Sequence, residues 1–170
     1  MTDKRRKFGT LVAALLPQLY RYAYWLNQDG QIAEDVVQDA LLRAWRAIDS
    51  LKDETRAKAW LLTIVRREHA RRFEGVQPVF VDLGALELAD TAYPAEAAAD
   101  AADLRRLIAE LEPAYREPLV LQVVVGLSCE EIAELLDLNK ATVLTRLFRA
   151  RRLLTQRVAA PVVTDAGGIL

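Results

Sequence analysis

The chain has 170 residues, of which 52% are apolar, so it is long enough for one ordinary domain or two small ones. No apolar run reaches the length of about 18 residues that a membrane span needs, and the basic start is not followed by a secretory signal, so we expect neither membrane insertion nor secretion. The single cysteine, Cys129, cannot form an internal disulfide, and we therefore expect a reduced, cytoplasmic setting.

The net charge of −1 conceals an uneven distribution of charge along the chain. Residues 74–104 hold seven acidic and no basic side chains, and the parts on either side are mildly basic. The overall charge is therefore uninformative about a nucleic-acid partner, and the clustering of positive charge matters instead.

Before the acidic segment, apolar residues recur at helical spacing in three stretches, and we predict helices over 11–26, 32–48 and 56–73. In the second helix, Asp35, Gln38 and Asp39 share one face, which suits a basic partner surface or is simply solvated. The opposite face carries the residues expected to turn inward, which are Val36, Val37, Ala40, Leu41 and Ala44.

The third predicted helix interleaves an aromatic residue with basic side chains, a pattern that suits single-stranded DNA. We expect Trp60 to pack in the core, with Leu61, Ile64 and Val65. The basic side chains are Lys58, Arg66, Arg67, Arg71 and Arg72. No metal site is expected, because the only histidine, His69, has no acidic group at ligand spacing.

The acidic segment contains glycines and prolines and lacks a sustained helical period, so we predict a flexible linker. Its charge suits either a path through a basic channel or a soluble tether. Helical patterns resume over 97–111, 114–125, 130–136 and 140–157, with Pro118 expected to kink the second of these. The predicted fold is all-α, with two small helical bundles joined by a flexible acidic linker.

The C-terminal bundle contains the signature of a helix-turn-helix. Ser128 and Glu131 form a Ser-x-x-Glu capping box that begins a helix. Asp137 tolerates the left-handed conformation that ends it, and Asn139 is a good N-cap for the next helix. Ala133 is small where the two helices must cross closely.

The second helix of this motif has two distinct faces. Val143, Leu147, Ala150 and Leu154 make an apolar stripe, and Thr142, Thr145, Arg149 and Arg152 lie opposite. Hydroxyl and guanidinium groups in this arrangement suit base edges and phosphates in a major groove. A solvated basic face is the alternative, but the capping box, the short turn and the small crossing residue together favour a DNA reader.

The segment LEPAYREPLVLQVVVGLSCEEIAELLDLNKATVLTRLFRARRLL resembles the C-terminal domain of extracytoplasmic-function sigma factors, the bacterial subunits that direct RNA polymerase to promoters. AEDVVQDALLRAW looks like the polymerase-binding helix of that family, and KAWLLTIVRREHARR is similar to its promoter-melting and −10-reading helix. These matches cover residues 11–73 and 98–157.

The resemblance implies an alternative sigma factor without catalytic residues, cofactor or metal. Its expected partners are core RNA polymerase, promoter DNA and an anti-sigma factor, with no small-molecule substrate. Residues 1–73 would be sigma domain 2, 74–97 the linker, 98–158 sigma domain 4 and 159–170 a flexible tail. A stand-alone helix-turn-helix regulator is the competing hypothesis. An enzyme ranks last, since one histidine, one cysteine and no glycine-rich phosphate loop leave little to build a site from.

The resemblance also assigns roles to individual residues. The loop 49–55 would capture a flipped base of the −10 strand. The expected polymerase-binding residues are Asp35, Gln38, Asp39 and Arg43. The expected −10 residues are Ser50, Lys52, Lys58, Arg66, Arg67, Arg71 and Arg72. The expected −35 residues are Lys140, Thr142, Thr145, Arg146, Phe148, Arg149 and Arg152, and related proteins read a GGAAC-like element.

The sequence departs from the family pattern at four positions. Arg67 stands where asparagine is usual and Leu144 where a basic residue is usual, while Asp137 and Ala141 stand in place of glycine. We therefore expect altered contacts to the −10 strand and to one backbone phosphate.

Overall fold

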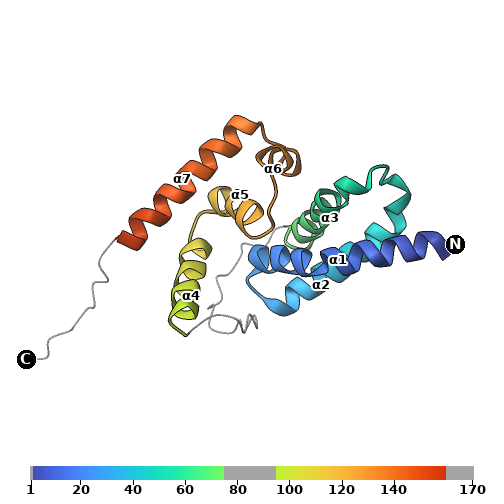
Figure 1. Ribbon diagram of the computed structural model, residues 1–170, viewed down its shortest axis with the longest axis horizontal. Coiled ribbons are helices and arrows are strands. Elements are labelled where there is room, and N and C mark those ends of the chain that lie inside the picture. Colours follow the sequence, from blue (N-terminus) through green and yellow to red (C-terminus); the bar gives the residue numbers. More distant parts are fainter. Residues whose placement is uncertain (1, 75–94, 160–170) are drawn as a thin grey trace, which may run out of the picture.

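The computed structural model describes residues 2–74 and 95–159, and every regular element in these ranges is a helix (Figure 1). The N-terminal body consists of α1 (Thr2–Asn27), α2 (Gly30–Ala47) and α3 (Ala57–Arg72), with short 3₁₀ helices η1 (Ile48–Ser50) and η2 (Glu54–Arg56) before α3. The C-terminal body consists of α4 (Ala95–Ala109), α5 (Pro113–Val123), α6 (Cys129–Leu136) and α7 (Lys140–Ala159). The predicted linker and tail lie largely outside the described residues.

The first helix is longer than the sequence pattern predicted, because α1 begins at Thr2 and continues through Pro17. Its first turns are held by contacts with the far end of α2 and the segment that follows. Phe8 packs edge-on against Trp45 with ring centroids 5.3 Å apart, and Lys4 pairs with Asp49 at 2.5 Å. These contacts join residues that are far apart in sequence, so the helical pattern after residue 11 could not predict them.

The second helix packs as its sequence predicts, but it begins at Gly30, two residues before the predicted start. The Asp29 carboxylate accepts a hydrogen bond from the Ile32 amide at 3.0 Å and caps the helix. Its buried stripe consists of Ala33, Val36, Val37, Ala40 and Ala44, while Leu41 is half-buried. This stripe packs α2 against α1 and α3.

The capping predictions for the C-terminal body are confirmed. The Ser128 hydroxyl accepts a hydrogen bond from the Glu131 amide at 3.2 Å, and the Glu131 carboxylate accepts one from the Ser128 amide at 2.8 Å. Asp137 ends α6 in the left-handed conformation, with φ 53° and ψ 50°. The Asn139 side chain then accepts a hydrogen bond from the Thr142 amide at 2.8 Å. Two helices therefore meet across a three-residue turn.

The apolar stripe of α7 packs as predicted, with Val143, Leu147 and Ala150 buried and Leu154 half-buried. α5 is continuous through Pro118, which is buried. None of the described helices combines the length and the low charge that crossing a membrane would require.

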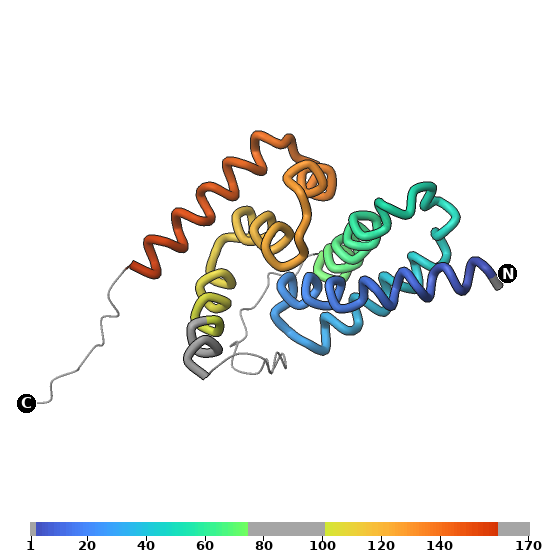
Figure 2. Tube along the Cα trace, in the orientation of Figure 1, coloured from blue at the N-terminus to red at the C-terminus, as the bar shows by residue number. Residues whose placement is uncertain are grey.

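The two bodies lie side by side, with α5 against α1 and α6 against α3 (Figure 2). One cluster of buried apolar residues includes side chains from both, among them Leu19 and Leu61 in the first and Leu121 and Ile132 in the second. Contact between the bodies is therefore apolar as well as polar.

The reciprocal capping box predicts a measurable loss of stability when the hydroxyl is removed. We expect Ser128→Ala to lower the free energy of unfolding by about 0.5–2 kcal/mol, because the Glu131 amide loses its acceptor. Chemical denaturation followed by circular dichroism measures the change.

Thr155→Ala is the matched control, because the Thr155 hydroxyl only donates to the Arg151 carbonyl of its own helix. An equal loss of stability in both variants would show that the capping box contributes no more to the free energy of unfolding than a hydroxyl within a helix does.

Candidate nucleic-acid and polymerase interfaces

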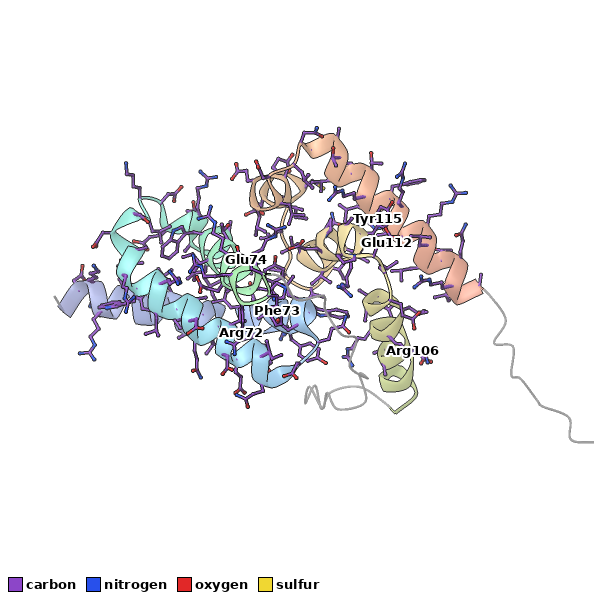
Figure 3. The ribbon with its side chains drawn as sticks, turned by 180° about the vertical axis from the view of Figure 1, so that it is seen from behind. Arg72, Phe73, Glu74, Arg106, Glu112 and Tyr115 are labelled. Carbon is purple, nitrogen blue, oxygen red and sulfur yellow. The ribbon has the colours of Figure 1, made fainter. Side chains whose placement is uncertain are left out.

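The polar face of α2 is partly neutralised by a residue of another helix. Arg72, at the end of α3 (Figure 3), lies 3.1 Å from an Asp35 carboxylate oxygen and 3.8 Å from one of Asp39. Gln38 and Asp39 are exposed, and Asp35 is half-buried. The face that was predicted to bind polymerase is therefore a mixed acidic and basic surface. Its basic member, Arg72, is one of the residues predicted to bind −10 DNA.

A second pairing links two other predicted site residues. Glu68 is the one buried charged residue among those described, with an exposed fraction of 7%. Its carboxylate pairs with Arg43 from α2 and with Arg71, one turn along α3, at 2.9 Å. Arg43 was predicted to bind polymerase and Arg71 to bind DNA, so one carboxylate orients residues of both sets.

Beside this polar face lies an apolar groove that the sequence analysis missed. The groove has a volume of about 850 Å³ and runs between α1 and α2, where Gln38 forms part of its lining. Leu42 is 59% exposed and Trp45 is 37% exposed. Both residues lie on α2 outside its buried stripe. Large apolar side chains at such positions were the feature of the sequence that could have indicated this groove. The remaining lining residues are Arg5, Phe8, Gly9 and Leu41.

The predicted −10 residues do not all gather on one surface. Lys58 donates a hydrogen bond to the Val125 carbonyl, and Arg66 donates from Nε to a Glu117 carboxylate oxygen at 2.8 Å. These two residues therefore face the C-terminal body, whereas Arg71 and Arg72 pair with acids of the N-terminal body. Arg67 is exposed.

The predicted base-capturing loop borders a cleft of about 370 Å³ between the two bodies. Trp60 packs against the core as expected, and it also lines this cleft. Ser50, Lys52 and Arg56 contribute from the N-terminal body, and Glu131, Glu134 and Leu135 contribute from α6.

Charged and polar groups at the contact between the bodies have shifted pKa values. Burial and the nearby Glu117 carboxylate raise the pKa of Tyr22, whose hydroxyl donates to Glu117 at 2.7 Å. Burial is the largest single influence on the pKa of Arg66 and acts to lower it, but the hydrogen bond to Glu117 and the attraction of the Glu117 charge together raise the pKa above its ordinary value. Burial lowers the pKa of His69, whose Nδ1 lies 2.7 Å from the Asn27 side-chain oxygen.

The predicted −35 residues lie on α7, and four of them form an exposed arc. We call Thr145, Phe148, Arg149 and Arg152 the recognition arc. Phe148 is 65% exposed, although it is a large apolar side chain. The Thr145 hydroxyl donates to the Ala141 carbonyl of its own helix at 2.9 Å. The other predicted residues are Lys140, which pairs with Glu130, and the half-buried Thr142 and Arg146.

Neither the cysteine nor the histidine belongs to a metal centre in the part of the chain that the structure describes. Cys129 is half-buried at the start of α6, with the Gln122 side-chain nitrogen 3.7 Å from its sulfur. Across residues 2–74 and 95–159, no three histidine, cysteine or acidic side chains gather closely enough to hold a metal ion.

Comparisons with known families match both bodies separately. The model of sigma-70 region 2 matches residues 11–76, and the model of sigma-70 region 4 matches residues 101–154. The chain is 32% identical over 163 residues to the RNA polymerase sigma factor CnrH of Cupriavidus metallidurans, covering 88% of this chain and 85% of that protein. It is 34% identical over 142 residues to the extracytoplasmic-function sigma factor SigL of Mycobacterium tuberculosis, covering 80% of each.

Solved structures agree with the sequence matches. The sigma factor RpoE from Bartonella quintana, solved in complex with the anti-sigma factor NepR, has a TM-score of 0.73 at 28% identity and covers 92% of this chain and 99% of its own. CnrH in complex with the cytosolic domain of CnrY has a TM-score of 0.67 at 28% identity, covering 91% of this chain and 88% of its own.

A stand-alone helix-turn-helix regulator would not account for the region 2 match over the N-terminal body. The relatives are sigma factors rather than enzymes, and the matches include both regions. The chain therefore belongs to the sigma-70 family as an extracytoplasmic-function sigma factor, a non-enzymatic protein that directs RNA polymerase to promoters.

Proposed function

We propose that residues 1–73 bind core RNA polymerase and read and melt the −10 element, and that residues 98–158 read the −35 element. Residues 74–97 serve as a flexible acidic linker and residues 159–170 as a flexible tail, and the protein acts in the cytoplasm. The main support for this division is that the two candidate binding surfaces lie on different bodies. The polar face of α2 belongs to the first, and the recognition arc of α7 belongs to the second.

Core polymerase binds the polar face of α2, through Asp35, Gln38, Asp39 and Arg43. Two carboxylates on one face of the helix suit a basic surface on the partner, and salt bridges with Arg72 and Glu68 hold this face in position. The neighbouring apolar groove adds Leu42 and Trp45 to the same contact. Large exposed apolar side chains beside a polar rim are typical of a protein-binding surface.

The −10 strand lies along α3 and the loop before it. Ser50 and Lys52 sit beside the cleft that receives a flipped base, and Lys58, Arg66, Arg67, Arg71 and Arg72 neutralise the backbone of the strand. Trp60 supplies the apolar wall of that cleft.

The −35 element is read by α7 from the major groove. Arg149 lies at the centre of the recognition arc, where its guanidinium can bond two acceptors of guanine, and Phe148 can contact a thymine methyl. Arg146 and Arg152 lie towards the edges of this surface, where phosphates run, and Lys140 and Thr142 precede them at the start of α7. Thr145 completes the base-facing group.

An anti-sigma protein is the proposed regulatory partner. RpoE and CnrH were both solved with such a partner. In this chain the α1–α2 groove and the recognition arc both leave large apolar side chains exposed. We expect a separate anti-sigma protein to cover the polymerase-binding and DNA-binding faces. A sigma factor that always purifies free and fully active, when expressed with its genomic neighbours, would contradict this.

Transcription with purified core polymerase tests the proposal as a whole. Core polymerase alone initiates without promoter specificity, and addition of this protein should direct initiation to promoters with a GGAAC-like −35 element. A protein that bound such DNA but never conferred specific initiation would not support the proposed division of roles.

Charge reversal on α2 tests the polymerase contact. Replacing both Asp35 and Asp39 by lysine should abolish binding to core polymerase, because the basic partner surface would then face four cationic groups with Arg43 and Arg72. A binding titration measures core affinity, and circular dichroism checks that helicity is retained.

Glu34→Lys is the matched control, since Glu34 is exposed on the same helix but points away from Asp35 by about 100°. Core affinity that was unchanged by the double reversal would refute the assigned face.

Two arginines of the recognition arc should affect DNA binding in different ways. Arg149→Ala should weaken −35 binding by roughly one to two orders of magnitude and relax the preference at one base pair, because a good base contact contributes about 1–3 kcal/mol. Arg152→Ala should weaken binding to every sequence and lower the salt slope by about 1.

A matrix of variants against base substitutions, measured at fixed salt, separates the two effects. If Arg149→Ala weakened all sites equally while Arg152→Ala altered base preference, the recognition arc would be wrongly placed.

A further inference from the structure

The two bodies meet through side chains that the proposed function gives to the −10 strand. Arg66 bonds Glu117 of α5 twice, from Nε to Oε1 at 2.8 Å and from Nη2 to Oε2 at 3.5 Å. Lys58 bonds the Val125 carbonyl just after the same helix. Ser50 and Lys52 line the cleft whose other wall is α6. Four of the seven proposed −10 residues therefore face the C-terminal body.

Glu117 is the centre of this contact, and the functional assignments above leave it unused. Its side chain is 17% exposed, and one of its oxygens also accepts the Tyr22 hydroxyl hydrogen bond from α1 at 2.7 Å. Tyr22 is fully buried. A carboxylate that is largely removed from water is stable only with such partners, and those partners come from two helices of the other body.

A second ion pair has the same polarity. Glu134 of α6 pairs with Arg56, which precedes α3, and both side chains are about 60% exposed, so solvent weakens this pair. Both contacts place an acidic group of the C-terminal body on a basic group of the N-terminal body. Guanidinium binds carboxylate and phosphate oxygens with the same fork of donors.

We infer that the C-terminal body covers the −10 surface of the free protein, and that Glu117 holds this closed arrangement by binding Arg66 where a DNA phosphate would bind. The inference rests on the proposed role of Arg66 and Lys58 in −10 binding. The recognition arc of α7 stays exposed in the same arrangement. Free protein in this state cannot hold the −10 strand until its two bodies separate.

Masking has a quantitative consequence for DNA binding. When only a fraction of molecules is open, the apparent dissociation constant for the strand rises by the inverse of that fraction. Hydrogen bonds to a charged group change an equilibrium by roughly tenfold or more. Weakening the contact between Glu117 and Arg66 should therefore separate the bodies. It should also tighten the binding of single-stranded DNA by the free protein.

The full-length chain can be tested with a spin label on each body. The labels are placed at Arg21→Cys on α1 and Gln156→Cys on α7, both exposed, in a Cys129→Ser background. Glu117→Gln should lengthen and broaden the distance between the labels. It should also tighten binding of a fluorescent thymidine 15-mer about tenfold, measured by anisotropy. Glu112→Gln, an exposed position at the start of the same helix (Figure 3), should change neither.

A charge exchange keeps the test decisive even if Glu117→Gln perturbs folding. Glu117→Arg should separate the labels, and adding Arg66→Glu should bring them together again, because the pair is restored with its polarity reversed. Circular dichroism confirms that each variant keeps its helices. Only the label distance is measured for the variants that change Arg66, since Arg66 is itself a proposed DNA contact.

Two results would overturn the inference, and they are distinguishable. An unchanged label distance in both Glu117→Gln and Glu117→Arg would show that Glu117 does not hold the bodies together, whatever Arg66 does with DNA. Separated labels with unchanged affinity for the 15-mer would show that the covered surface is not a DNA site, and the proposed −10 assignment would fail with it.

Discussion

The carboxylate of Glu117 determines how the two bodies of this sigma factor relate to one another. Its Oε1 atom accepts hydrogen bonds from Tyr22 on α1 and from Arg66 on α3, so one anion joins three helices of two bodies. Breaking the contact would return Glu117 to water but would leave the buried Tyr22 hydroxyl without this acceptor. Apolar packing brings the bodies together, and this polar contact selects which surfaces they cover.

The same electrostatic logic explains why an acidic helix precedes a basic one in the helix-turn-helix. Glu131 closes the capping box, Glu130 pairs with Lys140, and Glu134 reaches Arg56 of the other body. Each acidic side chain of α6 thus has a basic or amide partner, and none lies on the recognition arc. The segment can be nearly neutral in total while presenting an exposed positive surface on α7.

Sequence reasoning succeeded where structure is determined by neighbours in the chain. The Ser128 cap, the left-handed Asp137 and the buried face of α7 each depend on residues within about one or two turns. It failed for contacts between distant residues. The contact of Phe8 with Trp45 holds the early turns of α1, and Arg72 forms a salt bridge with Asp35. Arg66 forms a salt bridge with Glu117 of the other body. Helical periodicity says which face is apolar, but it does not say which helix will pack against the polar one.

These distant pairings also mean that the proposed polymerase and −10 surfaces are not electrostatically independent. Arg72 lies within 3.8 Å of two carboxylates of the α2 face, and Glu68 joins Arg43 to Arg71. A cationic partner surface that approaches Asp35 and Asp39 must compete with Arg72 for the same oxygens. A phosphate that approaches Arg72 must in turn compete with those carboxylates. Occupation of one surface therefore changes the charge that the other presents, because two sets of salt bridges connect them.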